Sequence, residues 1–148
     1  MGKIRYLGVL DFSAWQLVKA NLLSELRSWA PIVAIQSEYH VLEGQVERDM
    51  LPYCRAHGVG FIPYFPLAGG FFTGKYKRGE ARPPGSRGES SDYVRQYMTA
   101  ENFDKIEALA AWAGERGRGL NELVQAWLMA QPQVCSVISG RASGANMK

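Results

Sequence analysis

The sequence has few cysteines, no long apolar run and no large excess of one charge. Its two cysteines, Cys54 and Cys135, lie far apart and lack a Cys-x-x-Cys motif or a nearby histidine cluster. This spacing predicts neither a disulfide framework nor a zinc site and fits a reducing, cytoplasmic location. No apolar stretch approaches the ~18 uncharged residues of a membrane span, so no membrane partner is expected.

Charge does not indicate a partner either. The chain has 17 Lys and Arg residues against 14 Asp and Glu, a net charge of only +3, and the two signs are interleaved. A nucleic-acid-binding face needs a clustered basic surface, so none is expected. The basic start Met1–Tyr6 lacks the apolar run and cleavage site of a signal peptide.

The composition is that of a globular domain. The 148 residues are 47% hydrophobic and 21% charged, which is enough apolar material for a core and too much for a disordered chain. We expect one domain over residues 1–148.

Short apolar runs alternate with segments of helical periodicity. The first three runs start at Ile4, Val33 and Val59, 29 and 26 residues apart, which is the length of a βαβ unit and predicts a parallel sheet. The expected strands are Ile4–Leu10, Val33–Gln36, Gly60–Tyr64 and Val134–Ile138. The expected helices run from the N-cap Ser13 to Trp29, from Gln45 to His57, from Asn102 to Arg116 and from Leu120 to Ala130.

A segment rich in Gly, Pro, Ser and Arg interrupts this alternation. Residues 66–91 are expected to form a long loop, and loops of that length tend to be functional or disordered. Trp15, Trp29, Trp112 and Trp127 occupy helical positions and are predicted to pack in the core. His40 and His57 are expected at the surface or at a helix end, without a functional role.

Four β/α units amount to about half of an eightfold barrel, which takes roughly 250 residues. The competing architecture is an open, doubly wound sheet of four strands. The first turn lacks the G-x-G-x-x-G phosphate fingerprint, and no G-x-x-x-x-G-K-[S/T] occurs, which disfavours dinucleotide-binding and P-loop sheets. The predicted fold class is therefore α/β.

Three ordered motifs resemble the aldo-keto reductase superfamily. They are Ile4–Ser13 (IRYLGVLDFS), Ile35–His40 (IQSEYH) and Tyr64–Tyr76 (YFPLAGGFFTGKY), and Val137–Arg141 (VISGR) is similar to the family's last strand. The likeness extends from Ile4 to about Asn146. It implies a partial (β/α)8 TIM barrel, corresponding to strands five to eight with their helices, from a family that transfers hydride from NADPH to aldehydes and ketones.

The resemblance also implies a cofactor site. Gln36 would hydrogen-bond the nicotinamide carboxamide, and Tyr64 would stack on the nicotinamide ring. The backbone from Leu67 to Gly70, including Gly69, would approach the pyrophosphate, with Lys75 placing a positive charge near phosphate. The positions matching the grip on the adenosine 2′-phosphate region are Gly140, Ser143 and Asn146.

Some positions depart from the family pattern. Leu10 and Asp11 stand where the family usually has Ser-Asn, at the carboxamide-binding position, so a hydroxyl donor is lost and an amide becomes a carboxylate. Phe65 replaces a serine that would face the pyrophosphate, and Arg141 replaces a small residue. We expect these changes to weaken cofactor binding.

The family's reactive tyrosine and its supporting lysine, aspartate and histidine come from strands two to four, which have no counterpart in this sequence. The isolated chain is therefore expected to be inactive, a fragment that meets a small carbonyl substrate only if completed by the missing half. One alternative is a non-catalytic half-barrel module that binds a nucleotide or associates with itself into a homo-oligomer. The other is a non-functional remnant.

Overall fold

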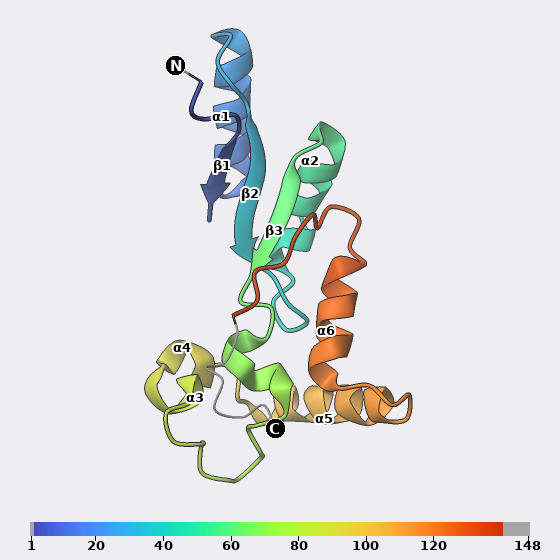
Figure 1. Ribbon diagram of the computed structural model, residues 1–148. Helices are drawn as coiled ribbons and strands as arrows, with labels where there is room; N and C mark the ends of the chain where they lie inside the picture. The colour runs from blue at the N-terminus through green and yellow to red at the C-terminus, as the bar shows by residue number, and fades with distance from the viewer. Residues whose placement is uncertain (1, 141–148) are drawn as a thin grey trace.

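The computed structural model describes residues 2–140 of the chain. Three parallel strands form a sheet in the order β1 (Leu7–Leu10), β2 (Ile32–Glu38) and β3 (Gly60–Tyr64) (Figure 1). Their carboxyl ends meet at one edge, which faces the lower part of the molecule in Figure 1. The predicted parallel, sequential order is confirmed for these strands.

The first strand is shorter than predicted. β1 starts at Leu7 and not at Ile4, because Leu7 is opposite Ile32, the first residue of its only neighbour. The residue before Ile32 is Pro31, which has no N–H to extend the ladder.

The predicted fourth strand, Val134–Ile138, is only partly formed. Val134 pairs with Phe61 and Ile138 with Tyr64, both in parallel but as isolated bridges. The two partners are three residues apart on β3 and four apart on the other segment, so one residue is left over between them. Such a bulge interrupts regular pairing, and residues 134–138 therefore extend the sheet irregularly beside β3.

The helices between the strands follow their predicted caps. Helix α1 (Ala14–Leu26) begins after Ser13, whose backbone N–H donates to Gln16 Oε1 at 2.8 Å. It ends before Trp29 because Ser28 adopts a left-handed φ of 55°. The second predicted helix is split into a short 3₁₀ turn, η1 (Gln45–Glu47), and α2 (Met50–His57), which ends at left-handed Gly58 as expected.

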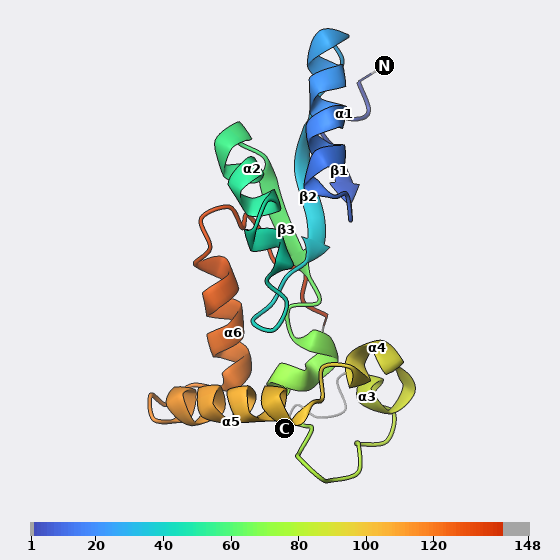
Figure 2. The same ribbon diagram turned by 180° about the vertical axis from the view of Figure 1, so that it is seen from behind.

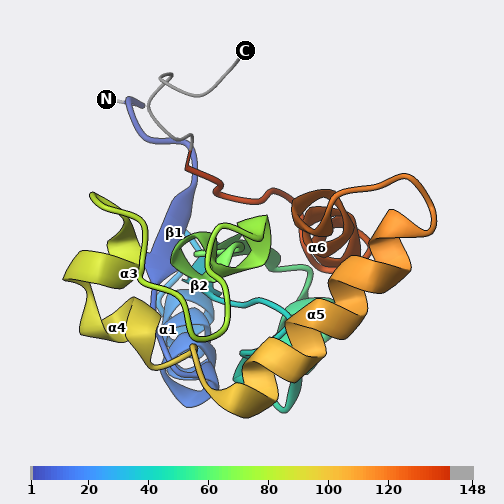
Figure 3. The ribbon, with the colours of Figure 1, turned by 90° about the horizontal axis from the view of Figure 1, so that it is seen from below.

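The second half of the chain is helical. Within residues 66–91 the chain forms a 3₁₀ segment, η2 (Ala68–Thr73), and the short helix α3 (Arg87–Ser90), and α4 (Asp92–Arg95) follows directly. Helices α5 (Ala100–Gly114) and α6 (Leu120–Met129) confirm the last two predicted helices to within two residues. Seen from below, η2 lies under the strand ends, with α3 and α4 on one side and α5 and α6 on the other (Figure 3).

The buried apolar residues form two clusters. The first, called here the sheet core, lies between the sheet and the helices α1, α2 and α6, on the side seen in Figure 2. Its members are Leu17, Ile35, Tyr39, Met50, Leu51, Cys54, Val59, Phe61 and Leu128. The second, the lower core, consists of Ala68, Phe71, Phe72, Tyr76, Tyr97, Ile106, Leu120 and Val124. Helix α6 joins the two, because Leu120, Val124 and Leu128 are spaced four residues apart along one stripe.

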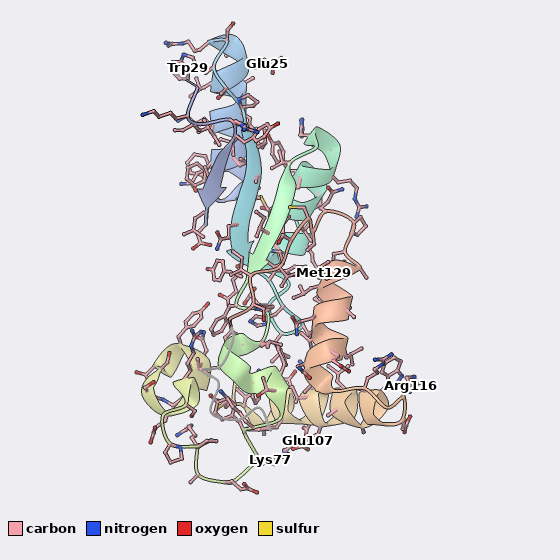
Figure 4. The ribbon with its side chains drawn as sticks, in the orientation of Figure 1. Glu25, Trp29, Lys77, Glu107, Arg116 and Met129 are labelled. Atoms are coloured by element: carbon pink, nitrogen blue, oxygen red, sulfur yellow. The ribbon has the colours of Figure 1, made fainter. Side chains whose placement is uncertain are left out.

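Three of the four tryptophans are not in the core, contrary to the prediction. Trp15, Trp29 and Trp112 are 65%, 60% and 48% exposed, and Trp29 lies beyond the end of α1 (Figure 4). Leu17 and Ser24 form the buried stripe of α1, so the apolar residues on its other sides remain in solvent. Trp127 is half-buried, with its ring centroid 5.2 Å from that of Tyr39.

The thiols of Cys54 and Cys135 are both free, as predicted. No helix between residues 2 and 140 is long and apolar enough to cross a membrane.

Candidate functional site

The carboxyl ends of the three strands bring together three predicted site residues. Asp11 follows β1, Gln36 lies in β2 opposite Leu10, and Tyr64 ends β3. The backbone N–H of Asp11 donates to the Gln36 carbonyl at 2.9 Å. The Tyr64 hydroxyl donates to Asp11 Oδ2 at 3.2 Å. Burial, followed by this hydrogen bond to the carboxylate, raises the pKa of Tyr64 to about 12.

The backbone is strained at this edge. Asp11, Phe65 and Ala68 have φ values of 53°, 59° and 45°, a region that residues with a Cβ rarely occupy. Asp11 follows β1 directly, and Phe65 and Ala68 follow β3. Strained conformations of this kind cluster at binding and catalytic sites, so the strand ends are the first place to look for function.

The segment after β3 turns through two left-handed glycines, Gly69 (φ 65°) and Gly70 (φ 97°), beside Leu67. A Cβ at Gly69 would lie 2.5 Å from Val94 Cγ2, and one at Gly70 would lie 2.5 Å from Lys75 Nζ. Packing against buried Val94 therefore requires a glycine at position 69, whereas at position 70 the left-handed φ requires it, because the exposed Lys75 side chain could move aside. The space that a Cβ would take is filled by Val94 beside Gly69 and by the end of the Lys75 side chain beside Gly70.

Lys75 places a positive charge beside this turn. Its side chain is exposed, with Nζ 5.0 Å from the Tyr76 ring centroid, and within residues 2–140 it forms no ion pair. The Ser86 hydroxyl, at the start of α3 against η2, is buried and has no hydrogen-bond partner in the described part of the chain. The exposed cation of Lys75 is a group that an anionic ligand uses, whereas the Ser86 hydroxyl is covered by protein.

The remaining predicted residues are placed differently. The Phe65 ring does not face an open turn but packs among His40, Tyr93 and Tyr97, with centroid distances of 6.1, 5.5 and 6.4 Å. Gly140 is exposed, with no atom within 4 Å of where its Cβ would be. Ser143 and Asn146 lie outside the described residues.

The sequence prediction missed a polar cluster around Glu38. Tyr97 donates to Glu38 Oε1 at 2.9 Å, Tyr93 donates to Oε2, and His40 Nε2 lies 3.2 Å from Oε1. Burial raises the pKa of Glu38, with smaller contributions of the same sign from Glu43 and Asp11, while the Tyr97 hydrogen bond lowers it.

His40 is fully buried, which corrects the expectation of a surface position. Burial lowers its pKa to about 4, so the ring is neutral at pH 7. A signal for this cluster was present in the sequence: Glu38 follows Gln36 at the two-residue period of a strand, so both point to the same face.

A hollow of about 800 Å³ opens at the strand ends, between the loop after β1, the loop after β2 and α4. Its charged lining residues are four carboxylates and one guanidinium: Asp11, Glu38, Glu43, Asp49 and Arg48. A negative lining repels phosphate. Phosphate is therefore disfavoured in the hollow, whose lining does not include Lys75. No group of three or more metal-ligating side chains occurs among residues 2–140.

These features define an α/β protein with a candidate site at the carboxyl ends of parallel strands, where barrel and open-sheet enzymes bind their ligands. A model of the aldo/keto reductase family matches residues 1–147, and the chain belongs to this family. Its three-stranded sheet and helices are consistent with part of that family's barrel.

Individual relatives agree with this assignment. The chain is 31% identical over 140 residues to the uncharacterized oxidoreductase YrpG of Bacillus subtilis (strain 168), covering 94% of this chain and 40% of the relative. It is 33% identical over 144 residues to a probable voltage-gated potassium channel subunit beta of Oryza sativa subsp. japonica, covering 94% and 43%. With the aldo-keto reductase AMT2 of Alternaria alternata it shares 29% over 148 residues, covering 97% and 38%. The chain thus spans about two fifths of the length of these relatives.

Proposed function

We propose that this chain is the cofactor-binding half of an NADPH-dependent aldo-keto reductase, one domain that corresponds to strands five to eight of the barrel. The whole protein would reduce an aldehyde or ketone to an alcohol. The observation that carries the proposal is the meeting of Asp11, Gln36 and Tyr64 at the strand ends, beside a turn of glycines next to Lys75.

The described residues fit a nicotinamide nucleotide. The Gln36 side chain is half-buried and makes no hydrogen bond to another described residue, so its amide is available to a carboxamide. Tyr64 offers a ring at the mouth of the site, and the exposed Lys75, whose side chain lies against Gly70, offers a positive charge for phosphate. When bound, a reduced nicotinamide supplies hydride to a carbonyl carbon.

The chain's own residues would bind and orient, but not complete the reaction. Reduction of a carbonyl also needs a group that donates a proton to the developing alkoxide, worth about 10²–10⁴-fold in rate. By family resemblance this group is a tyrosine on strands two to four. The tyrosines found here at the strand ends, Tyr64, Tyr93 and Tyr97, each donate to a carboxylate. Their hydroxyls are therefore committed within the protein.

The test is a titration of the purified chain with NADPH, followed by cofactor fluorescence. We expect weak binding that Tyr64→Ala and Lys75→Ala each reduce several-fold, while Lys77→Ala, an exposed lysine two residues further on (Figure 4), serves as the matched control. Addition of a reactive aldehyde should produce no cofactor oxidation. Turnover near the usual 1–10³ per second, or binding indifferent to Tyr64→Ala, would overturn the proposal.

A second candidate function is self-association of a half barrel, favoured by the apolar surface on one side of the molecule. Large apolar residues on and before β1 and on α1 are exposed, namely Ile4, Tyr6, Leu7, Leu10, Trp15, Val18, Leu22, Leu23, Leu26 and Trp29. Exposed patches of this extent, next to an edge strand, are typical of interfaces. The rice relative is named as a probable channel subunit, and this name supports an interaction role as the second candidate.

Sedimentation tests this candidate. We expect a second copy of the chain to cover the face, giving a dimer or larger species that Leu22→Lys with Leu26→Lys converts to monomer. A wild-type chain that sediments as a single monomer would contradict it.

A further inference from the structure

The carboxylate of Glu38 ties a short helix to the end of β2. Its side chain is 13% exposed and both oxygens are occupied: Oε1 by the Tyr97 hydroxyl at 2.9 Å and His40 Nε2 at 3.2 Å, and Oε2 by the Tyr93 hydroxyl. Tyr93 belongs to α4. Tyr97 lies four residues after Tyr93, just beyond the end of α4. One carboxylate thus holds two neighbouring hydroxyls of the α4 region.

The same helix covers the glycine turn. Val94, next to Tyr93, is 1% exposed and packs so closely on Gly69 that a Cβ there would come within 2.5 Å. Phe65 lies 5.5 Å from Tyr93 between ring centroids, and its Cζ would be 3.2 Å from a Cβ at Gly69. The position of α4 and the shape of the turn are therefore coupled.

The other side-chain hydrogen bonds of α4 are local. Arg95 donates to the Glu89 carbonyl at 2.7 Å and pairs with Asp92. Among the described residues, side-chain hydrogen bonds from α4 and Tyr97 to the sheet run through Glu38 alone. Loss of this acceptor would leave α4 held to the sheet by apolar contacts.

We infer that Glu38 is a proton-sensitive latch that holds α4 over the Gly69–Gly70 turn and so governs the entry and release of the nucleotide. This inference rests on the proposed function of the turn. Ionised Glu38 accepts both tyrosine hydroxyls in charge-assisted hydrogen bonds, which are about twice as strong as neutral ones. A proton on Glu38 removes the charge and occupies one oxygen, so one tyrosine loses its acceptor.

The groups around Glu38 set the pH at which the latch opens. His40, Tyr93 and Tyr97 contact the carboxylate, and Glu43, together with the Asp11–Tyr64 pair, lies in the same hollow. Burial and the charges of Glu43 and Asp11 raise the pKa of Glu38, while His40 stays neutral because burial lowers its pKa to about 4. The tyrosine hydrogen bonds favour the ionised carboxylate and are lost when α4 moves away, so the latch is closed at neutral pH and a proton on Glu38 favours opening. Burial and the neighbouring carboxylates raise the pH at which this proton binds.

The first experiment measures amide hydrogen exchange of residues 86–98 in the nucleotide-free chain at several pH values. We expect Glu38→Gln to speed exchange there roughly tenfold or more at neutral pH, and to abolish the further rise seen in the wild type on acidification. Tyr93→Phe keeps the ring and removes one hydroxyl, so it should give a smaller increase. Asp49→Asn is the matched control, a carboxylate of the same hollow that neither bonds α4 nor contributes to the shifted pKa of Glu38, and it should behave as the wild type.

The second experiment measures NADPH release by stopped-flow fluorescence for the same variants. Faster release from Glu38→Gln, without the wild type's pH dependence, supports the latch. Unchanged exchange at residues 86–98 in both Glu38→Gln and Tyr93→Phe overturns it, as does NADPH binding with an unaltered release rate. Absence of NADPH binding to the wild type would refute the proposed function instead, and the exchange experiment would still decide whether the latch exists. Circular dichroism of both variants separates loss of the latch from loss of the fold.

Discussion

The two cores of the molecule are built differently. The sheet core is mostly aliphatic and lies between regular strands and helices, whereas the lower core is rich in aromatic residues and surrounds an irregular segment with left-handed glycines. The strained residues Phe65 and Ala68 and the buried His40 adjoin the lower core. The difference indicates that the sheet core supplies the stability on which the lower core can hold unfavourable backbone and titratable groups in place.

The largest effect is expected from the sheet core. Phe61 is fully buried in β3, its ring edge-to-face with Tyr39 at 5.9 Å. Phe61→Ala should lower the free energy of unfolding by about 3–5 kcal/mol, measured by urea denaturation. The next residue, Ile62, points to the half-exposed face of the sheet. Ile62→Ala should cost clearly less, and equal losses would contradict the assignment of the core to the helix side.

Acid should weaken the lower core next. Burial lowers the pKa of His40 from 6.5 to about 4, so the unfolded chain takes up the proton first as the pH falls. The contribution of His40 is fully present above pH 6.5 and is lost as the pH falls toward 4, by up to about 3 kcal/mol. The raised pKa of Glu38 acts in the opposite direction, so the net loss in the wild type is smaller.

The comparison of variants isolates the histidine. Urea unfolding at a series of pH values should show less acid destabilisation for His40→Asn than for the wild type. His57→Asn, at an exposed histidine of α2, is the matched control. An identical pH profile for His40→Asn and the wild type would contradict the buried, neutral state of His40.

A smaller effect is expected at the glycine turn. Gly69→Ala adds a Cβ at left-handed φ, 2.5 Å from Val94 Cγ2, whereas Gly79→Ala has the same backbone strain and open space. Gly69→Ala should destabilise the chain by about 1–3 kcal/mol more than Gly79→Ala, because only the former overpacks the core. Combining Gly69→Ala with Val94→Ala should recover part of that difference in thermal unfolding. If the double variant recovers no stability, the added Cβ does not clash with the Val94 side chain.

The smallest effect on stability is expected at Asp11, an exposed residue at the strand ends. Asp11→Asn should change the free energy of unfolding by no more than about 0.5 kcal/mol, yet ultraviolet titration should show the pKa of Tyr64 falling from about 12. The lost carboxylate should also weaken binding of oxidised NADP, whose ring is cationic, relative to NADPH. If the ratio of the affinities for NADP and NADPH does not change, the nicotinamide ring does not lie near Asp11.

Regular periodicity explains what was predictable in the fold. The order of the strands, the cap at Ser13 and the stop at Gly58 follow from local chemistry, and the structure reproduces them. The length of β1 and the interruption near Val134 depend on which partner lies opposite, which no local pattern contains. The exposure of Trp15 and Trp29 has the same origin. The periodicity of an apolar helix face does not indicate whether another part of the protein covers that face.

The candidate site was predictable only for residues that lie at the ends of the predicted strands. Asp11 follows β1, Gln36 lies near the end of β2 and Tyr64 ends β3, so parallel order alone brings them to one edge. The tyrosine partners of Glu38, Tyr93 in α4 and Tyr97 just after it, lie 55 and 59 residues further along the chain. Contacts over such separations depend on the path of the intervening segment, and residues 66–91 gave no periodicity from which to infer that path.

The position of Leu128 in the sheet core has a consequence for biosynthesis. The other members of that core are complete once Phe61 has been made, but the place of Leu128 stays empty until 67 more residues have been added. At about 5–20 residues per second, translation over that stretch takes roughly 3–13 s. During this interval the apolar surface that Leu128 later covers would be exposed to other chains. The cell's chaperones would therefore meet this protein chiefly as a sheet without its closing helix.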